Sequence, residues 1–184
     1  MPISFGIMAS QYTGHIVTSS FESIATVSGS GASSITFSSI PSTYKHLQIR
    51  FIGGNTVPDV AYVKFNSDTT SANYATHALT GSGSSATAYG TTNAGGVNIQ
   101  VSWGVYSNGT IFNAGIIDII DYASTSKFKT VKAFSGWDTN GSSGQAIELD
   151  SGLWRSTSAI NSISINVSSN WATGSTFALY GIKG

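Results

Sequence analysis

Charged residues are scarce in this chain. Only 9% of its 184 residues are Asp, Glu, Lys or Arg, whereas about a quarter of the residues in an ordinary soluble domain are charged. The 8 basic and 8 acidic side chains cancel to a formal net charge of zero. Because no basic stripe is present to neutralise phosphates, we do not expect nucleic acid to be a partner.

Cysteine is absent from the sequence. Disulfide bonds and cysteine-based metal sites are therefore excluded. Long apolar runs are also missing, since none approaches the roughly 20 residues of a membrane-spanning helix, and we expect no membrane insertion. The N-terminal stretch MPISFGIMASQYTG has neither the basic start nor the apolar segment of a secretory signal.

Patterns that would indicate catalysis are missing as well. The sequence has no G-x-S-x-G elbow, and His15, His46 and His77 are too far apart for an HExxH-type zinc site. The segment that starts at Asp138 (DTNG) begins like a calcium loop but lacks the later acidic ligand, so an ordinary turn explains it better. We therefore expect no enzyme activity, no metal site and no cofactor.

What the chain does contain is a series of short alternating runs. Hydrophobic residues make up 40% of the sequence, and Leu47, Ile49 and Phe51 are typical in sharing one face of a run whose other face is polar. This period of two indicates half-buried strands. About ten such runs, with turn residues between them, predict an all-β protein. We expect an antiparallel jelly-roll-type sandwich over residues 21–184 and an N-terminal arm over residues 1–20.

The strongest local pattern lies in the middle of the chain. An Asn-Gly pair at 108–109 favours a tight hairpin turn. It predicts strands over 97–107 and 110–122, and a third strand over 128–135 would complete a meander. The expected cross-strand neighbours are Val101 with Ile116, Ile116 with Phe134, Asp118 with Lys132, Ile119 with Val131 and Asp121 with Lys129.

Several predicted strands are apolar on both faces. Ile116 and Ile120 point to one side of their strand, and Ile117 and Ile119 point to the other. A sandwich buries only one face of each sheet, so the second apolar face needs a cover. We expect that cover to be a second subunit, most simply in a homotrimer, with the arm and long loops of the same chain as the alternative. The expected interface residues are Ile117, Ile119, Phe177, Leu179, Tyr180 and Ile182.

Three tryptophans, Trp137, Trp154 and Trp171, stand beside turn residues. Aromatic side chains in loops above a rigid sheet can stack on sugar rings or anchor partner proteins. The alternative is that they close the ends of the sandwich or fill subunit seams. The expected contacts to a glycan or a partner are Trp137, Asp138, Asn140, Trp154 and Trp171.

The amino-acid sequence resembles that of a known group of proteins. The stretches that carry the resemblance are FESIATVSGSGASSITFSSIPSTYKHLQIR, DIIDYASTSKFKTVKAFSG, SGLWRSTSAINSISINV and the terminal STFALYGIKG. They are similar to virion proteins of tailed bacteriophages, cyanophages among them, which are usually labelled tail fibre or virion structural protein. The resemblance spans residues 21–184 and is most specific in the terminal stretch.

The resemblance implies a β-sandwich displayed on a virion, on the tail or the capsid exterior, after synthesis in the host cytoplasm. It also implies that residues 1–20, which lie outside the match, attach the module to other virion proteins. The function we expect is a tail fibre or receptor-binding module that contacts host surface glycans, because neutral sugars are recognised without charge pairing. The alternative is a capsid decoration, cement or fibre-anchoring protein, which the absence of any fibre shaft favours.

Overall fold

The computed structural model describes residues 20–184 except 56, 58, 93–98, 103–110 and 140–144. This part of the chain is almost entirely strand, with one short 3-10 turn, η1 (Ser71–Asn73). The strands are β1 (Phe21–Gly29), β2 (Ser34–Phe37), β3 (His46–Gly53), β4 (Ala61–Phe65), β5 (Tyr74–Gly81), β6 (Ala86–Thr92), β7 (Ile99–Ser102), β8 (Asn113–Ile120), β9 (Lys129–Trp137), β10 (Ala146–Trp154), β11 (Ile163–Asn166) and β12 (Ser175–Ile182). No helix among the described residues is long and apolar enough to cross a membrane.

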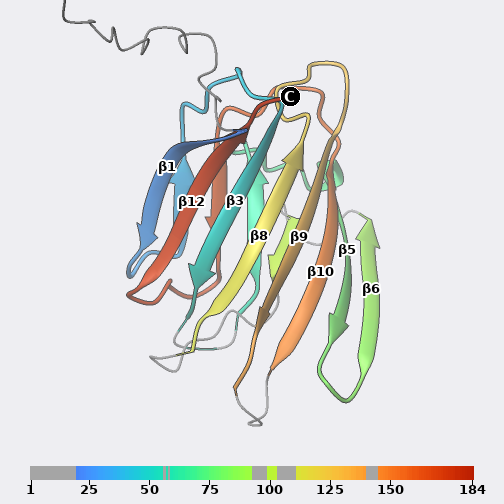
Figure 1. Ribbon diagram of the computed structural model, residues 1–184. Coiled ribbons are helices and arrows are strands. Elements are labelled where there is room, and N and C mark those ends of the chain that lie inside the picture. The colour runs from blue at the N-terminus through green and yellow to red at the C-terminus, as the bar shows by residue number, and fades with distance from the viewer. Residues whose placement is uncertain (1–19, 56, 58, 93–98, 103–110, 140–144) are drawn as a thin grey trace, which may run out of the picture.

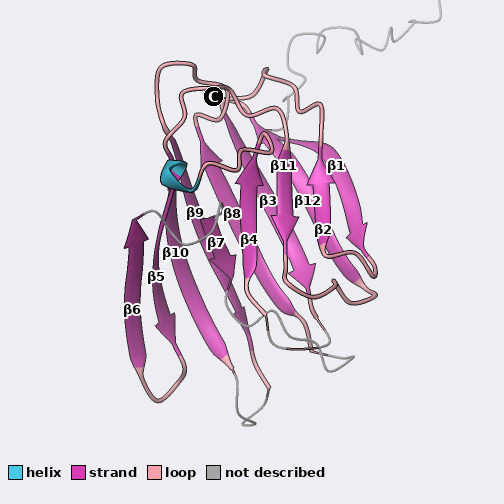
Figure 2. Cartoon of the chain, turned by 180° about the vertical axis from the view of Figure 1, so that it is seen from behind, coloured by secondary structure: helices cyan, strands magenta, loops and turns pink. Residues whose placement is uncertain are grey.

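The strands form two antiparallel sheets that pack face to face (Figures 1 and 2). The large sheet has 8 strands in the order β1-β12-β3-β8-β9-β10-β5-β6, and the small sheet has 4 strands in the order β2-β11-β4-β7. Side chains alternate between the two faces of each strand. One face of each sheet therefore lies against the other sheet, and the other face is directed outward.

The connectivity is that of a jelly roll. The first half of the large sheet, β1-β12-β3-β8, faces the small sheet β2-β11-β4-β7. Along the chain the path passes from one sheet to the other at every connection except β5 to β6, β8 to β9 and β9 to β10. Apart from the hairpins β5–β6 and β9–β10, this path is that of two interlocked Greek keys. The all-β jelly-roll prediction is confirmed, with 12 strands in the described part of the chain instead of about ten.

Two inserted hairpins extend the large sheet beyond the jelly roll. The β5–β6 pair follows β4, and the β9–β10 pair follows β8, so that the sheet continues as β8-β9-β10-β5-β6. The last strand of the small sheet, β7, packs against β9, β10 and β5. The extension therefore has an inner face over β7 and a long outer face (Figure 1).

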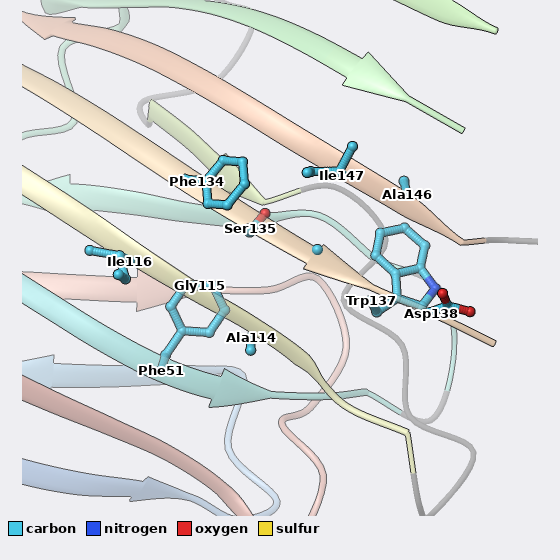
Figure 3. A pocket seen from close by; sticks show the side chains of 11 residues that line it. Phe51, Ala114, Gly115, Ile116, Phe134, Ser135, Trp137, Asp138, Ala146 and Ile147 are labelled. Carbon is cyan, nitrogen blue, oxygen red and sulfur yellow. The ribbon is translucent and has the colours of Figure 1, made fainter. Parts of the chain in front are cut away.

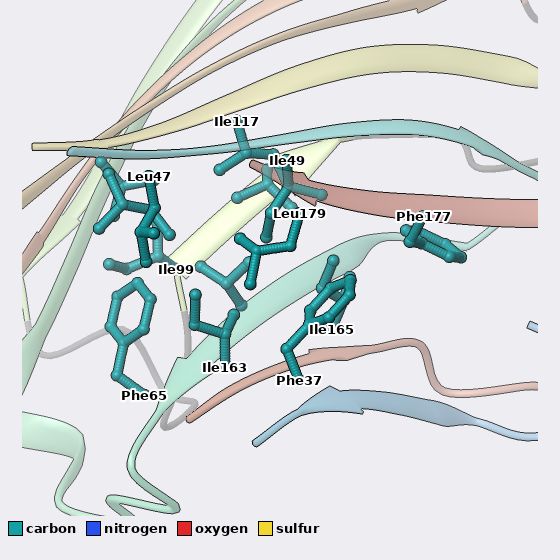
Figure 4. Packing of buried hydrophobic residues seen from close by; sticks show 14 of the residues in the cluster. Phe37, Leu47, Ile49, Phe65, Ile99, Ile117, Ile163, Ile165, Phe177 and Leu179 are labelled. Atoms are coloured by element: carbon teal, nitrogen blue, oxygen red, sulfur yellow. The ribbon is translucent and has the colours of Figure 1, made fainter. Parts of the chain in front are cut away.

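The core lies between the sheets. Figure 4 shows Leu47, Ile49 and Leu179 of the large sheet directed towards Ile163 and Ile165 of the small sheet. All of these side chains are buried, as are those of Ile117, Ile119 and Phe177. The predicted inward face of β3 is thereby confirmed. Close packing of branched aliphatic residues of this kind is the main contribution to the stability of such a sandwich.

The predicted hairpin between 97–107 and 110–122 is wrong in its pairing. The turn at 108–109 lies outside the described residues, but β7 pairs with β4 in the small sheet and β8 pairs with β3 and β9 in the large sheet. Val101 is therefore not a ladder neighbour of Ile116. All four residues of β7 are buried, and β8 buries Ile117 and Ile119 on one face. Apolar residues at alternate positions do not tell whether two strands lie side by side in one sheet or face each other across a core.

The predicted pairing of β8 with β9 is confirmed. Ile116 lies opposite Phe134, Asp118 opposite Lys132, and Ile119 opposite Val131. The prediction fails only beyond the end of β8. There Asp121 turns away, and its carboxylate binds Nζ of Lys127 at 2.8 Å and Nζ of Lys45 at 3.3 Å instead of binding Lys129.

Candidate functional site

The main candidate site is the outer face of the extended large sheet. One register row crosses five adjacent strands: Ile116 of β8 lies opposite Phe134 of β9, then Leu149 of β10, Leu79 of β5 and Ala88 of β6. These residues occupy the same face because paired residues in an antiparallel ladder project to the same side. The row is therefore continuous across the whole extension.

A second apolar row runs parallel to the first. It contains Ile147 of β10, with Ala114 and Ala86 at its two ends and glycines at 136 and 81 between them. Ile147, Leu149 and Phe134 are 54%, 53% and 52% exposed. We call the two rows the apolar band, and its large members are Ile116, Phe134, Ile147, Leu149 and Leu79.

The band is hollowed where its outward positions lack large side chains. A depression of about 560 Å³ lies over Ala114 and Gly136, between Ile116, Phe134 and Ile147. Figure 3 shows these side chains around the depression, with Trp137 and Asp138 at one end. The depression is thus lined by hydrocarbon over most of its extent and has a polar group at its rim.

A polar row borders the band on one side. Its members are Gln48, Asp118, Lys132, Ser151 and His77, in strand order from β3 to β5. The amide Nε2 of Gln48 donates a hydrogen bond of 2.8 Å to the carboxylate of Asp118. An apolar centre bordered by polar groups is the arrangement found in protein–protein interfaces.

Four of the six residues predicted to form a subunit interface lie in the core of the chain itself. Ile117, Ile119, Phe177 and Leu179 are fully buried between the sheets and are not available to a second subunit, which corrects the prediction. The sequence shows two apolar faces on β8, and the structure buries the one that we assigned to the interface. The outward face of β8 instead carries Ile116 into the apolar band.

The other two residues of that prediction, Tyr180 and Ile182, lie on the outward face of β12 and are half-buried. The guanidinium of Arg50 lies 5.3 Å from the centre of the Tyr180 ring. It also lies 5.4 Å from the centre of the Phe21 ring. This end of the outer face is therefore partly covered by the chain's own cation–π contacts.

Trp154 and Trp171 are buried and cannot contact a glycan, which corrects that part of the prediction. The indole Nε1 of Trp154 donates a 2.7 Å hydrogen bond to the carboxylate of Asp68. Burial alone would raise the pKa of Asp68, but hydrogen bonds from Asn73, Trp154 and Thr70 lower it to about 2. Trp154 therefore joins the core to an ionised carboxylate.

Trp171 packs edge-on against Phe177, with ring centres 4.7 Å apart. It is a core residue at the end of the sandwich, as the alternative interpretation of the tryptophans states. Of the predicted contact residues, Trp137 and Asp138 remain at the surface, where both line the depression. Asn140 lies outside the described residues.

The inner face of β10 carries two buried acids beneath the band. Glu148 accepts hydrogen bonds from Nε2 of Gln100 at 2.8 Å and from Oγ1 of Thr80 at 3.2 Å. Asp150 is 1% exposed, and neither of its carboxylate oxygens has a hydrogen-bond partner within the described part of the chain. Burial, with a smaller effect from the charge of Glu148, raises the pKa of Asp150 to about 8. We therefore expect Asp150 to be mostly protonated at neutral pH.

The strand β10 is thus inverted relative to an ordinary amphipathic strand. Ile147 and Leu149 point outward and are half-exposed, whereas Glu148 and Asp150 point inward and are buried. Sequence reasoning missed Ile147, Leu149 and Leu79 as site residues, since an alternation of apolar residues with acids predicts that the acids face solvent. What marks these residues as a site is the long apolar row that they form together. The register of β5 and β10 reveals this row, and the sequence alone does not.

Other sites are not evident in the part of the chain that is described. It contains no group of three or more His, Cys, Asp or Glu side chains placed to hold a metal ion. The Nδ1 atom of His46 accepts a 3.0 Å hydrogen bond from the backbone N–H of Asp121.

Comparisons with protein-family models, with curated proteins and with solved structures found no match.

Proposed function

We propose that this chain is a structural protein of a bacteriophage virion that attaches to another virion protein through the apolar band. The observation that carries the proposal is the inversion of β10, which places Ile147 and Leu149 outward at the cost of burying Asp150. Burying an unpaired acid is unfavourable. A sequence that tolerates this burial while it exposes large aliphatic side chains is best explained by an outer face that another molecule covers.

Three further features support the proposal. The band extends over five strands, is mostly free of charge and is hollowed only by an open depression, which suits a protein surface better than a small ligand. The zero net charge removes electrostatic repulsion between neighbouring copies in a lattice or fibre. The resemblance of residues 21–184 to tail fibre and virion structural proteins gives the class of assembly, on the tail or the capsid exterior.

The test is the position and copy number of the protein in the particle. An antibody against the chain, viewed on phage particles by electron microscopy, should mark the tail or the outer capsid surface. A few to a few tens of copies would indicate a tail component, and hundreds would indicate a capsid decoration protein. Absence of the chain from purified particles would contradict the proposal.

The second candidate is a receptor-binding module of the tail that contacts host surface glycans. It is favoured by Trp137 and Asp138, which offer an aromatic ring and a carboxylate at the rim of the depression. A sugar bound there would stack on the indole, and one of its hydroxyl groups would donate a hydrogen bond to the carboxylate. This candidate is the weaker one, because the rest of the depression is apolar and Trp154 and Trp171 are buried.

If this module binds glycans, the substitution Trp137→Ala should lower glycan-array binding and host adsorption roughly two- to tenfold. Stacking on one aromatic ring contributes about 0.5–1.5 kcal/mol, and each 1.4 kcal/mol is a factor of about ten in affinity. Thermal unfolding of the variant checks that the fold is retained. Phe128→Ala serves as the matched control, because it removes an exposed aromatic ring that does not line the depression. Unchanged adsorption after Trp137→Ala would eliminate this candidate.

A further inference from the structure

Among the strands that the structure describes, β6 has the most open edge. β6 is the last strand of the large sheet, and among the described residues only β5 pairs with it (Figure 1). The ladder with β5 is regular over its whole length, from Ala75 opposite Thr92 to Gly81 opposite Ala86. The backbone N–H and C=O groups on the other side of β6 therefore point away from the sheet in a regular row.

The remaining sheet edges carry features that hinder pairing. At the opposite edge of the large sheet, β1 has a register shift between Ser23 and Ala25 and an ion pair of 2.8 Å between Glu22 and Lys183. The two edges of the small sheet, β2 and β7, have 4 residues each. Bulges, charges and short length are the usual protections of edge strands in soluble proteins.

β6 has none of these protections. It is 7 residues long, with the sequence ATAYGTT, and contains no charged residue and no proline. Every residue from Ala86 to Thr91 is exposed. Threonine and tyrosine are enriched in β-strands. An uncharged, regular and exposed edge of this length is a template for another strand.

We infer that β6 pairs antiparallel with β6 of a second copy of this chain, about a two-fold axis. In such a pair the free backbone N–H and C=O groups of β6 find partners in both copies at once. Because β6 carries no charge, two identical strands meet without repulsion. The first row of the apolar band ends at Ala88 on β6. Pairing therefore joins the bands of the two copies into one continuous surface.

This arrangement differs from the trimer expected from the sequence. A closed ring built by edge pairing would join β6 of one copy to β1 of the next, and the bulge and charges of β1 oppose that contact. The two-fold pair uses only the unprotected edge. The inference does not depend on the proposed function, because it concerns the purified chain alone.

The test is the oligomeric state of the purified chain, measured by sedimentation or by light scattering after gel filtration. We expect a dimer, and we expect Ala88→Lys to raise its dissociation constant at least tenfold, because the two new charges would face each other near the axis. Ser28→Lys is the matched control. It places the same charge on the other edge strand, β1, at a residue that is also exposed, and should leave the dimer unchanged.

Single cysteines give a second, independent measurement. Because the chain has no cysteine of its own, a Cys placed in turn at each position from 86 to 92 should form an intermolecular disulfide only at the one or two positions next to the axis. A Cys at position 28 should form none. The inference is overturned if the chain is monomeric up to about 1 mM, if it is a trimer, or if Ala88→Lys and Ser28→Lys have equal effects.

Discussion

Replacement of Asp150 by Asn should stabilise the protein, by roughly 2–4 kcal/mol at pH 7. The carboxyl group is buried, and its oxygens lack hydrogen-bond partners in the described part of the chain. Folding at neutral pH therefore requires the uptake of a proton that the unfolded chain has released. Asparagine has nearly the same shape and carries no charge, so it removes this requirement.

The same substitution should change the pH dependence of stability. The pKa of Asp150 is raised from 3.8 to about 8 in the folded state. The folded protein therefore holds a proton that the unfolded chain loses between these values, and stability falls as pH rises through this range. Protonated Asp150 makes its full contribution to stability below a pH of about 4, and this contribution is lost above a pH of about 8. The variant should lack this decline.

Urea unfolding of the two proteins between pH 4 and 9 measures both effects. Asp118→Asn is the matched control, since Asp118 lies on the outer face and accepts a hydrogen bond from Gln48 that asparagine can also accept. We expect the control to shift stability by less than about 1 kcal/mol. If Asp150→Asn destabilises the protein throughout this range, Asp150 is ionised and paired in the folded state, contrary to our description.

The substitution Phe177→Ala should destabilise the protein by roughly 3–5 kcal/mol. Phe177 is fully buried and packs against Phe51 and Trp171, with ring centres 5.8 and 4.7 Å away. Removing its ring leaves a cavity that the two neighbouring aromatic residues cannot fill without leaving their own contacts. The free energy of unfolding from urea titration gives the value directly.

Phe134→Ala makes the same chemical change on the outer face. Phe134 is 52% exposed, so its loss should alter the stability of the isolated chain by less than about 1 kcal/mol. The pair of variants therefore distinguishes the buried face of the large sheet from the outer face. Equal losses at the two positions would mean that the assignment of the faces, or the absence of a cover over Phe134, is incorrect.

The sequence was sufficient to predict the class of fold but not the assignment of faces. The alternation in strands such as β3 is a local property and predicts burial correctly at Leu47, Ile49 and Phe51. The pairing of β8 with β9 was also predictable, because a short connection and complementary residues determine its register. The position of β7 was not, since crossing to the other sheet leaves no local pattern.

The candidate site depends on contacts between strands that are distant in the chain. Leu149 lies beside Leu79 because β10 pairs with β5, and these strands are separated by β6, β7, β8 and β9 along the sequence. In β8, Ile116 and Ile117 are equally hydrophobic, so local preference cannot decide which of them faces the core. Which of the two is buried depends on the position of the opposing sheet, and that position follows from the jelly-roll connectivity as a whole.

The most direct test of the account is the accessibility of the apolar band in the free chain and in the particle. A thiol introduced as Leu149→Cys is the only one in the chain, and its reaction with a maleimide reports exposure at the centre of the band. We predict rapid labelling of the purified chain and strong protection in phage particles that carry the variant. Equal labelling rates in the two states would contradict the claim that this face binds another virion protein.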